Sequence, residues 1–214
     1  MVGIRKKERL AAFHRENILE TARKLFHKNG IDGTTMDDIA KQADYSKTTI
    51  YNYFGSKEEL VSHLLYQGAE LLKTRMRENA EKSGNFAEFY EKLTKAFVDL
   101  HSKRPIDYAG FAGDIPFDKN APATDVRRKI YLSGEELTGI IAEKINAALT
   151  SKEIALADDV EPSILFFLFC IMGIVEHSAK KEEYIMYKIG KSREEFLEFA
   201  FRRLFQSVSP PQGK

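Results

Sequence analysis

Apolar residues recur along this chain at the spacing of helices. Ile18, Leu19, Ala22, Leu25 and Phe26 lie at positions i, i+1, i+4, i+7 and i+8, which places them on one face of a helix. Asn29-Gly30 is a natural end for this helix. No stretch alternates apolar and polar residues in the manner of a strand. The pattern therefore predicts an all-α fold.

Capping residues divide the next segment into three further helices. Thr35, with Asp38 three residues later, is typical of an N-cap, and an inward stripe follows it: Met36, Ile39, Ala40 and Ala43. Ser46 caps a third helix. Ser56 caps a fourth, with Glu59 completing a capping box. We expect this fourth helix to run from residue 57 to about residue 81.

The rest of the chain continues in helices. We expect them at residues 86–103, 125–149, 162–181 and 192–207. Residues 104–122, "RPIDYAGFAGDIPFDKNAP", are punctuated by proline and glycine and are predicted to be a loop. The predicted organisation is a small N-terminal domain at residues 1–57, followed by a C-terminal helical bundle at residues 58–214. The helix at 57–81 links the two.

Composition narrows the class of protein. The chain has 214 residues, of which 43% are hydrophobic and 30% charged, as expected for a soluble globular protein. We expect no secretion signal. The longest apolar run, residues 164–175, is too short to span a bilayer, so we predict a cytoplasmic protein without a membrane partner. The single cysteine, Cys170, fits a reducing compartment.

Positive charge is concentrated near the N-terminus. Residues 1–57 hold 11 Lys/Arg against 7 Asp/Glu, which leaves 22 against 25 in the remainder. Arg5, Lys6, Lys7 and Arg9 form a small basic arm. This distribution permits an anionic partner at the N-terminal end without requiring one.

The third helix, within "SKTTIYNYF", is unusually rich in hydrogen-bonding side chains. At about 100° per residue, Ile50 and Phe54 face inward together. The opposite face carries polar side chains, flanked by Thr49 and Tyr53: Lys47, Thr48, Tyr51 and Asn52. Two short helices with such a face on the second are typical of a helix-turn-helix, whose second helix enters the major groove of DNA. The alternative is an ordinary solvated helix face.

The residues from Ile18 to Leu65, "ILETARKLFHKNGIDGTTMDDIAKQADYSKTTIYNYFGSKEELVSHLL", closely resemble the N-terminal DNA-binding domain of TetR-family transcriptional regulators. The resemblance lies in an "A..LF...G....T...IA..A" lead followed by "S...IY.YF..K..L". It implies contacts with double-stranded DNA through residues on and around the helix-turn-helix: Thr35, Tyr45, Ser46, Lys47, Thr48, Tyr51, Asn52, Tyr53 and Lys57. Thr49, which flanks the polar face, is also expected to lie at this surface.

Three positions depart from the family pattern. The turn usually reads Ala-Gly-Val, and here it reads Ala43-Asp44-Tyr45. Aspartate can adopt a left-handed backbone conformation at some cost. Tyr45 either turns outward to DNA or repacks the turn. Thr48 stands where glycine is common, which changes the approach to the DNA backbone.

The resemblance further implies that the C-terminal helices form a homodimer and enclose a ligand cavity. The sequence supports dimerisation independently, because residues 164–175 are apolar around the whole helix and the last helix also carries many aromatic residues. The alternative is a core buried entirely within one subunit.

Candidate residues for binding an apolar or aromatic effector lie in or near the loop predicted at 104–122 and on the apolar helix. They are Phe97, His101, Tyr108, Phe111, Phe117, Phe167 and Cys170. In the alternative interpretation, the aromatic residues only pack a long loop onto the bundle, and Cys170 is a small buried side chain.

We find no motif for catalysis, for a cofactor or for a metal. An enzyme is therefore not expected. The sequence predicts a ligand-responsive transcriptional regulator, in particular a homodimeric repressor that a small molecule releases from a near-palindromic operator. The alternative is a DNA-binding protein whose bundle responds to a protein partner.

Overall fold

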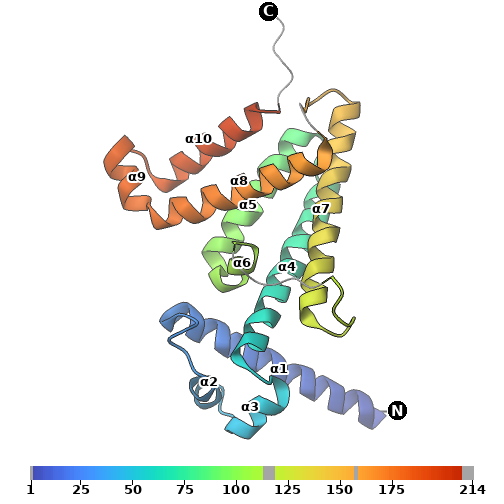
Figure 1. Cartoon of the computed structure of the whole chain (residues 1–214), viewed down its shortest axis with the longest axis vertical. Coiled ribbons are helices and arrows are strands. Elements are labelled where there is room, and N and C mark those ends of the chain that lie inside the picture. Colours follow the sequence, from blue (N-terminus) through green and yellow to red (C-terminus); the bar gives the residue numbers. More distant parts are fainter. Residues whose placement is uncertain (1, 113–118, 157–158, 209–214) are drawn as a thin grey trace, which may run out of the picture.

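The computed structural model describes residues 2–112, 119–156 and 159–208, and these ranges form helices and connecting loops without strands. Two short helices, α2 and α3, lie at one end of the molecule, and α9 and α10 lie at the other (Figure 1). The helices are α1 (Val2–Asn29), α2 (Met36–Gln42), α3 (Lys47–Tyr53), α4 (Lys57–Glu81), α5 (Phe86–Lys103), α6 (Pro105–Ala112), α7 (Val126–Thr150), α8 (Val160–Lys180), α9 (Glu182–Ile189) and α10 (Arg193–Gln206). The predicted all-α fold is confirmed.

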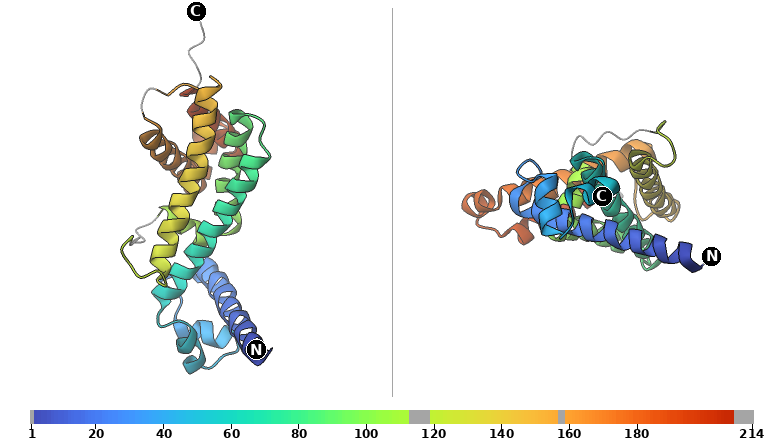
Figure 2. Two further views of the ribbon diagram at one scale, coloured as in Figure 1. Left: turned by 90° about the vertical axis from the view of Figure 1, so that its right-hand side faces the viewer. Right: turned by 90° about the horizontal axis from the view of Figure 1, so that it is seen from below.

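The described residues form two hydrophobic clusters, and α4 contributes to both. The first cluster joins α1, α2 and α3 and includes Leu60 and Leu64 of α4. The second includes Leu72 and Met76, further along the same helix, and joins α4 to α5, α7 and α8. Both views show α4 running from α3 into the bundle, where α7 lies alongside it (Figures 1 and 2).

Two helices differ from the sequence-based expectations. The stretch predicted to be a loop begins with helix α6, in which Pro105 occupies the first position. Proline suits this position because its fixed φ is already helical. A backbone N–H at the first position of a helix has no acceptor within the helix, so its absence in proline costs no hydrogen bond. Helix α9 was not predicted; it ends at Gly190, whose φ of +65° is left-handed.

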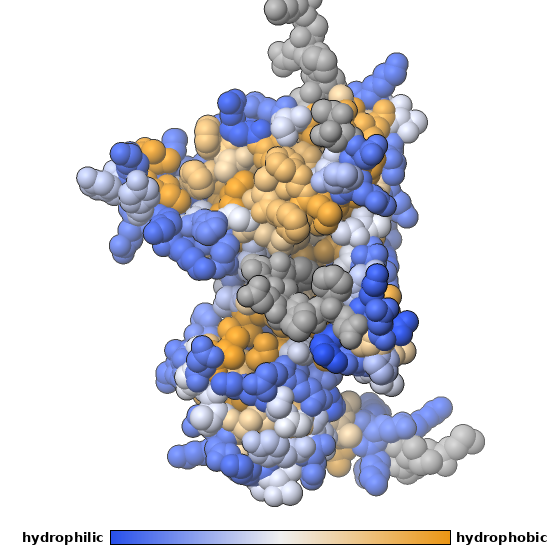
Figure 3. Space-filling view, viewed as in Figure 1, coloured by the Kyte–Doolittle hydropathy of each residue, from blue (hydrophilic) through white to orange (hydrophobic). Residues whose placement is uncertain are grey.

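Helix α8 extends beyond the apolar run at residues 164–175 on which the expectation of no membrane span was based. Its 21 residues make it the one helix in the described ranges that length and composition would allow to cross a membrane, whereas the 12-residue apolar run alone is too short. One side of α8 packs into the bundle through Ile164, Ile171 and Val175. Its other side leaves Leu165, Phe166 and Phe169 half or more exposed. Apolar atoms are prominent over this upper part of the molecule (Figure 3).

Candidate nucleic-acid interface

The ends of α2 and α3 are fixed by local hydrogen bonds. Thr35 accepts a hydrogen bond from the backbone N–H of Asp38, and the Asp38 carboxylate accepts one in return from the backbone N–H of Thr35, which completes a capping box. Hydrogen bonding from Thr35 also lowers the pKa of Asp38. Ser46 caps α3 by accepting a hydrogen bond from the backbone N–H of Thr49.

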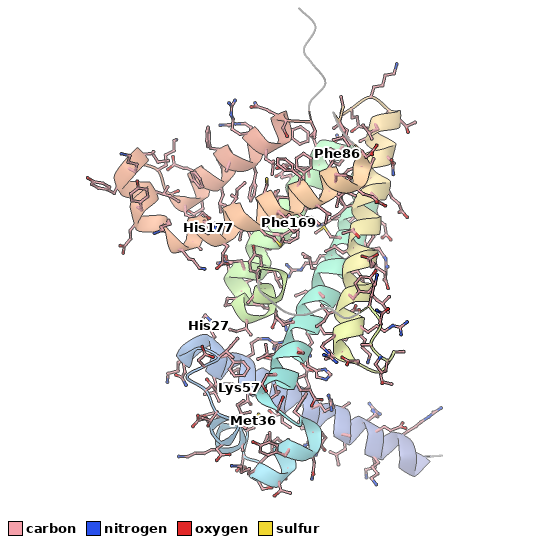
Figure 4. All side chains as sticks on the ribbon, viewed as in Figure 1. His27, Met36, Lys57, Phe86, Phe169 and His177 are labelled. Carbon is pink, nitrogen blue, oxygen red and sulfur yellow. The ribbon has the colours of Figure 1, made fainter. Side chains whose placement is uncertain are left out.

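Between the two helices, the chain turns at Asp44, whose φ of +59° is left-handed. The predicted tolerance of aspartate at this turn position is therefore observed. The turn brings α3 across α2, because Ile39, Ile50 and Phe54 are fully buried together in the first cluster. Lys57 and Met36 mark this end of the molecule in Figure 4.

The outer face of α3 is polar and exposed. It carries the four side chains that the helical wheel placed there: Lys47, Thr48, Tyr51 and Asn52. Thr49 and Tyr53 are half-buried at its edges. In the described part of the chain, Thr48 and Asn52 have no side-chain hydrogen bond to another residue. These two groups can therefore bind an external partner without breaking an internal bond.

The two lysines of the predicted interface have partners within the protein. Lys47 Nζ lies 2.8 Å from Asp37 Oδ1, and this partner raises the pKa of Lys47. Lys57 Nζ donates to the carbonyl oxygens of Ile31 at 2.8 Å and Thr34 at 3.1 Å. Lys57 thus ties the start of α4 to the α1–α2 connection, in addition to any contact it makes outside the protein.

Tyr45 packs on α1 in this structure. Its hydroxyl lies 2.6 Å from His14 Nδ1, and the two rings meet edge to face. Asn17 donates to the same hydroxyl at 3.4 Å. Of the two roles that the sequence left open for Tyr45, the structure therefore shows the repacked turn.

Arg15 joins α1 to the end of α3, a role that the sequence did not reveal. Its guanidinium donates to the Tyr53 carbonyl oxygen at 2.8 Å and lies over the ring of Phe54. A second N–H points to His63 Nε2 at 3.1 Å. Burial lowers the pKa of His63 and the Arg15 charge lowers it further, and both effects favour the neutral imidazole, which can accept this bond. No local spacing signals these contacts, because the partners are 38 and 48 residues away.

The predicted effector residues lie mainly in the packed bundle. Phe97 and Tyr108 are almost fully buried, and Tyr108 donates to the carbonyl oxygen of Met172 at 3.1 Å. His101 contacts the Tyr108 ring edge-on and pairs with Glu176. Cys170 is partly buried. The side chains of Phe111 and Phe117 lie outside the described residues.

Two concave sites lie in the C-terminal bundle, and one of them is lined by a predicted effector residue. Phe167 lines an apolar cavity of about 30 Å³ inside the bundle, together with Phe89, Ile141 and Ile171. A more open groove of about 790 Å³ runs between α5 and α10. Tyr90, Val98, Leu197 and Phe201 line this groove, and none of the predicted effector residues lies in it. Among the described residues, no group of His, Cys, Asp and Glu is arranged to hold a metal ion.

The capped helix pair, its buried inner face and its exposed polar outer face define a helix-turn-helix DNA-binding protein. Residues 18–64 match the family model described as "Bacterial regulatory proteins, tetR family". The N-terminal part of the chain is therefore a TetR-family DNA-binding domain, and proteins similar to the chain are TetR-family regulators.

Two relatives by sequence and one solved structure of similar fold give the extent of the similarity. The chain is 25% identical over 156 residues to the Staphylococcus aureus (strain Newman) biofilm operon icaADBC negative transcriptional regulator IcaR, covering 72% of this chain and 80% of that protein. It is 41% identical over 83 residues to the uncharacterised Bacillus subtilis regulator YhgD, covering 39% and 44%. The structure of Bacillus subtilis FadR in complex with stearoyl-CoA superposes with a TM-score of 0.66 at 18% identity, covering 90% of this chain and 98% of FadR.

Proposed function

We propose that the protein is a cytoplasmic transcriptional repressor that binds near-palindromic operator DNA as a homodimer and is released by a small, largely apolar or aromatic effector. The observation that carries the DNA-binding part is the exposed polar face of α3, which presents Thr48, Tyr51 and Asn52. The opposite face of this helix is anchored in the core by the buried side chains of Ile50 and Phe54. Asn52 can donate and accept at one base edge, as reading adenine requires. The hydroxyls suit phosphate oxygens.

The exposed apolar side of α8 supports the dimer. Leu165, Phe166 and Phe169 are 50%, 54% and 63% exposed, and α10 adds Phe199 at 45%. Phe169 is labelled on α8, far from Lys57, in Figure 4. Several large apolar side chains exposed on neighbouring helices are typical of a protein interface. In a dimer, the two recognition helices would bind half-sites about 34–36 Å apart, or at a multiple of this distance.

Repression and an apolar effector draw support from the relatives. IcaR is named a negative regulator, and FadR was solved with stearoyl-CoA, a ligand with a long apolar chain. We assign DNA binding to residues 1–57 and effector binding with dimerisation to residues 58–214.

The switch in this proposal uses α4 and α6. Helix α4 contributes to both hydrophobic clusters, so a shift of its far end moves its start beside α3. Three consecutive residues of α6 connect this helix to the first hydrophobic cluster, to α1 and to the second hydrophobic cluster. Ile106 packs on the first cluster, Asp107 pairs with the buried Arg23 of α1 at 3.0 Å, and Tyr108 is buried in the second cluster. An effector must favour one of two arrangements to act, and a coupling of about 1–3 kcal/mol changes DNA affinity roughly 5- to 150-fold.

A second candidate function has its own support. The apolar cavity inside the bundle is only about 30 Å³, far smaller than the roughly 300–1,000 Å³ of a typical ligand pocket. A filled bundle beside an exposed apolar face favours regulation by a protein partner that binds α8. A compound that raises the melting temperature and also weakens DNA binding supports the small-molecule effector instead.

The DNA-binding proposal is tested by selecting bound sequences from a random pool of duplexes. We expect a near-palindrome with two half-sites. The Asn52→Ala variant should select the same site with relaxed preference at one position of each half-site, equivalent to about 1–3 kcal/mol, because one base contact is lost. Uniform weakening on all sequences would make Asn52 a backbone contact. Failure of the unaltered protein to enrich any sequence would reject specific DNA binding.

A further inference from the structure

The first half of α1 projects beyond the buried core of the N-terminal domain. The first buried residue of α1 among those described is Ile18, and Leu10 and Phe13 are 55% and 65% exposed. In Figures 1 and 2, this part of the helix extends sideways from the helix-turn-helix and stays at the same end of the molecule as α3. The arm therefore lies on the side of the protein that presents the recognition helix.

The arm carries four exposed cations within five residues. They are Arg5, Lys6, Lys7 and Arg9, with Glu8 between them. In the described part of the chain, none of these four takes part in an ion pair. In contrast, three cations beside α3 have partners: Lys47 with Asp37, Lys57 with two carbonyl oxygens and Arg15 with the Tyr53 carbonyl oxygen.

We infer that this basic arm, residues 5–9, is a second DNA-contacting surface that binds phosphates of the duplex beside the site occupied by α3. The inference rests on the proposed function, because it requires the helix-turn-helix to bind DNA. Lysine and arginine gain affinity for a phosphate backbone by releasing counterions, whatever the base sequence. Unpaired cations do so without first losing an internal partner.

The length of the arm determines how far it reaches. His14 marks the point where α1 meets the turn, through Tyr45. Arg5 lies nine residues before His14, which at 1.5 Å per residue is about 14 Å along the helix. This distance corresponds to about four base pairs at 3.4 Å each. Protection of DNA should therefore extend up to about four base pairs further beside each half-site when the arm is intact.

The test neutralises the arm and measures DNA affinity against salt. The arm variant carries Arg5→Gln, Lys6→Gln, Lys7→Gln and Arg9→Gln in the full chain. A matched control carries Lys180→Gln, Lys181→Gln, Lys188→Gln and Lys191→Gln, four exposed cations at and around α9, at the other end of the molecule. Both variants lose four positive charges. Binding to a labelled 40-base-pair duplex, with the near-palindrome selected above at its centre, is followed by fluorescence anisotropy between 50 and 200 mM salt.

We expect the arm variant to bind more weakly and to lower the slope of log affinity against log salt by about 2–4 per bound protomer, since each lost phosphate contact contributes about 0.9. The control should keep the slope of the unaltered protein. Shortening the duplex flanks should remove the difference between the arm variant and the unaltered protein. None of the substituted residues is buried, and equal melting temperatures verify that both variants are folded.

Equal slopes in the arm variant and the unaltered protein would overturn the inference while leaving DNA binding by α3 intact. Equal losses in the arm variant and the control would also overturn it, because total charge would then account for the effect. If the unaltered protein bound no DNA at all, the proposed function itself would fail, which is a distinguishable result.

Discussion

At the scale of single residues, Lys57 has a structural role that the sequence did not reveal, beside the DNA contact predicted for it. Its position at the first turn of α4 predicts a phosphate contact. Its ammonium group also bonds to the carbonyl oxygens of Ile31 and Thr34, which are distant in the chain. The contact depends on how α4 packs against the α1–α2 connection, and no local pattern encodes that approach.

Lys57→Met is therefore expected to lower the free energy of unfolding by about 1–3 kcal/mol, because hydrogen bonds from a charged donor are lost and two carbonyl oxygens lose a partner. Urea unfolding followed by circular dichroism measures this change. Lys47→Met is the matched control, since its partner Asp37 and Lys47 itself are both more than 60% exposed and solvent screens such pairs, so they add little to stability. A loss no larger for Lys57→Met than for Lys47→Met would show that the carbonyl contacts do not stabilise the fold.

The helix-turn-helix residues illustrate what sequence alone can establish. The wheel placed Ile50 and Phe54 inside and Thr48 and Asn52 outside correctly, because a helical period is local information. The orientation of Tyr45 stayed open, because it depends on His14 and Asn17, which approach only when α1 packs across the turn.

At the scale of helices, capping residues made some boundaries predictable. The predicted helices at 57–81 and 86–103 are observed with those bounds, since Ser56 and Asn85 each accept a hydrogen bond from a backbone N–H in the first turn. Helix α6 was missed because its proline and glycine were interpreted as loop residues. The Arg23–Asp107 pair, 84 residues apart, has no signature in the sequence.

The contact between α4 and α6 depends on Gly68. A Cβ atom at this position would lie 2.7 Å from the Asp107 carbonyl oxygen and 2.8 Å from its Cβ. Both distances are too short for non-bonded atoms, so a larger residue would force the two helices apart. The close approach keeps Asp107 within reach of Arg23.

Gly68→Ala is expected to destabilise the protein by about 1–3 kcal/mol, the usual cost of overpacking, despite the better helix propensity of alanine. Gly134→Ala on α7 is the control. A Cβ atom there meets nothing within 4 Å, so this substitution should stabilise the protein by up to about 1 kcal/mol. Thermal unfolding of both variants gives the comparison. Stabilisation by Gly68→Ala would mean that α6 moves away without cost.

At the scale of the whole molecule, the exposed side of α8 is the feature that a single subunit does not explain. Its sequence is apolar around the full circumference, but only one side faces the bundle. Phe169 is the most exposed of its large apolar residues at 63%.

Phe169→Glu is expected to convert a dimer into a monomer at micromolar concentration, because a charge would be buried without a partner at the interface. Sedimentation velocity measures the change in mass. Phe13→Glu is the control, since Phe13 is equally exposed at 65% but lies on α1, far from α8. A monomeric unaltered protein would contradict the proposed dimer, and a dimeric Phe169→Glu variant would place the interface elsewhere.

The sharing of α4 between two hydrophobic clusters has a consequence for how the protein melts. Leu60 and Leu64 belong to one cluster, Leu72 and Met76 to the other, and no loop interrupts the helix between them. If either cluster unfolded, half of α4 would lose its packing contacts, and the remaining cluster would be destabilised through the rest of that helix. The protein should therefore unfold in a single cooperative transition, and a fragment cut between Leu64 and Leu72 would divide the one helix on which both clusters depend.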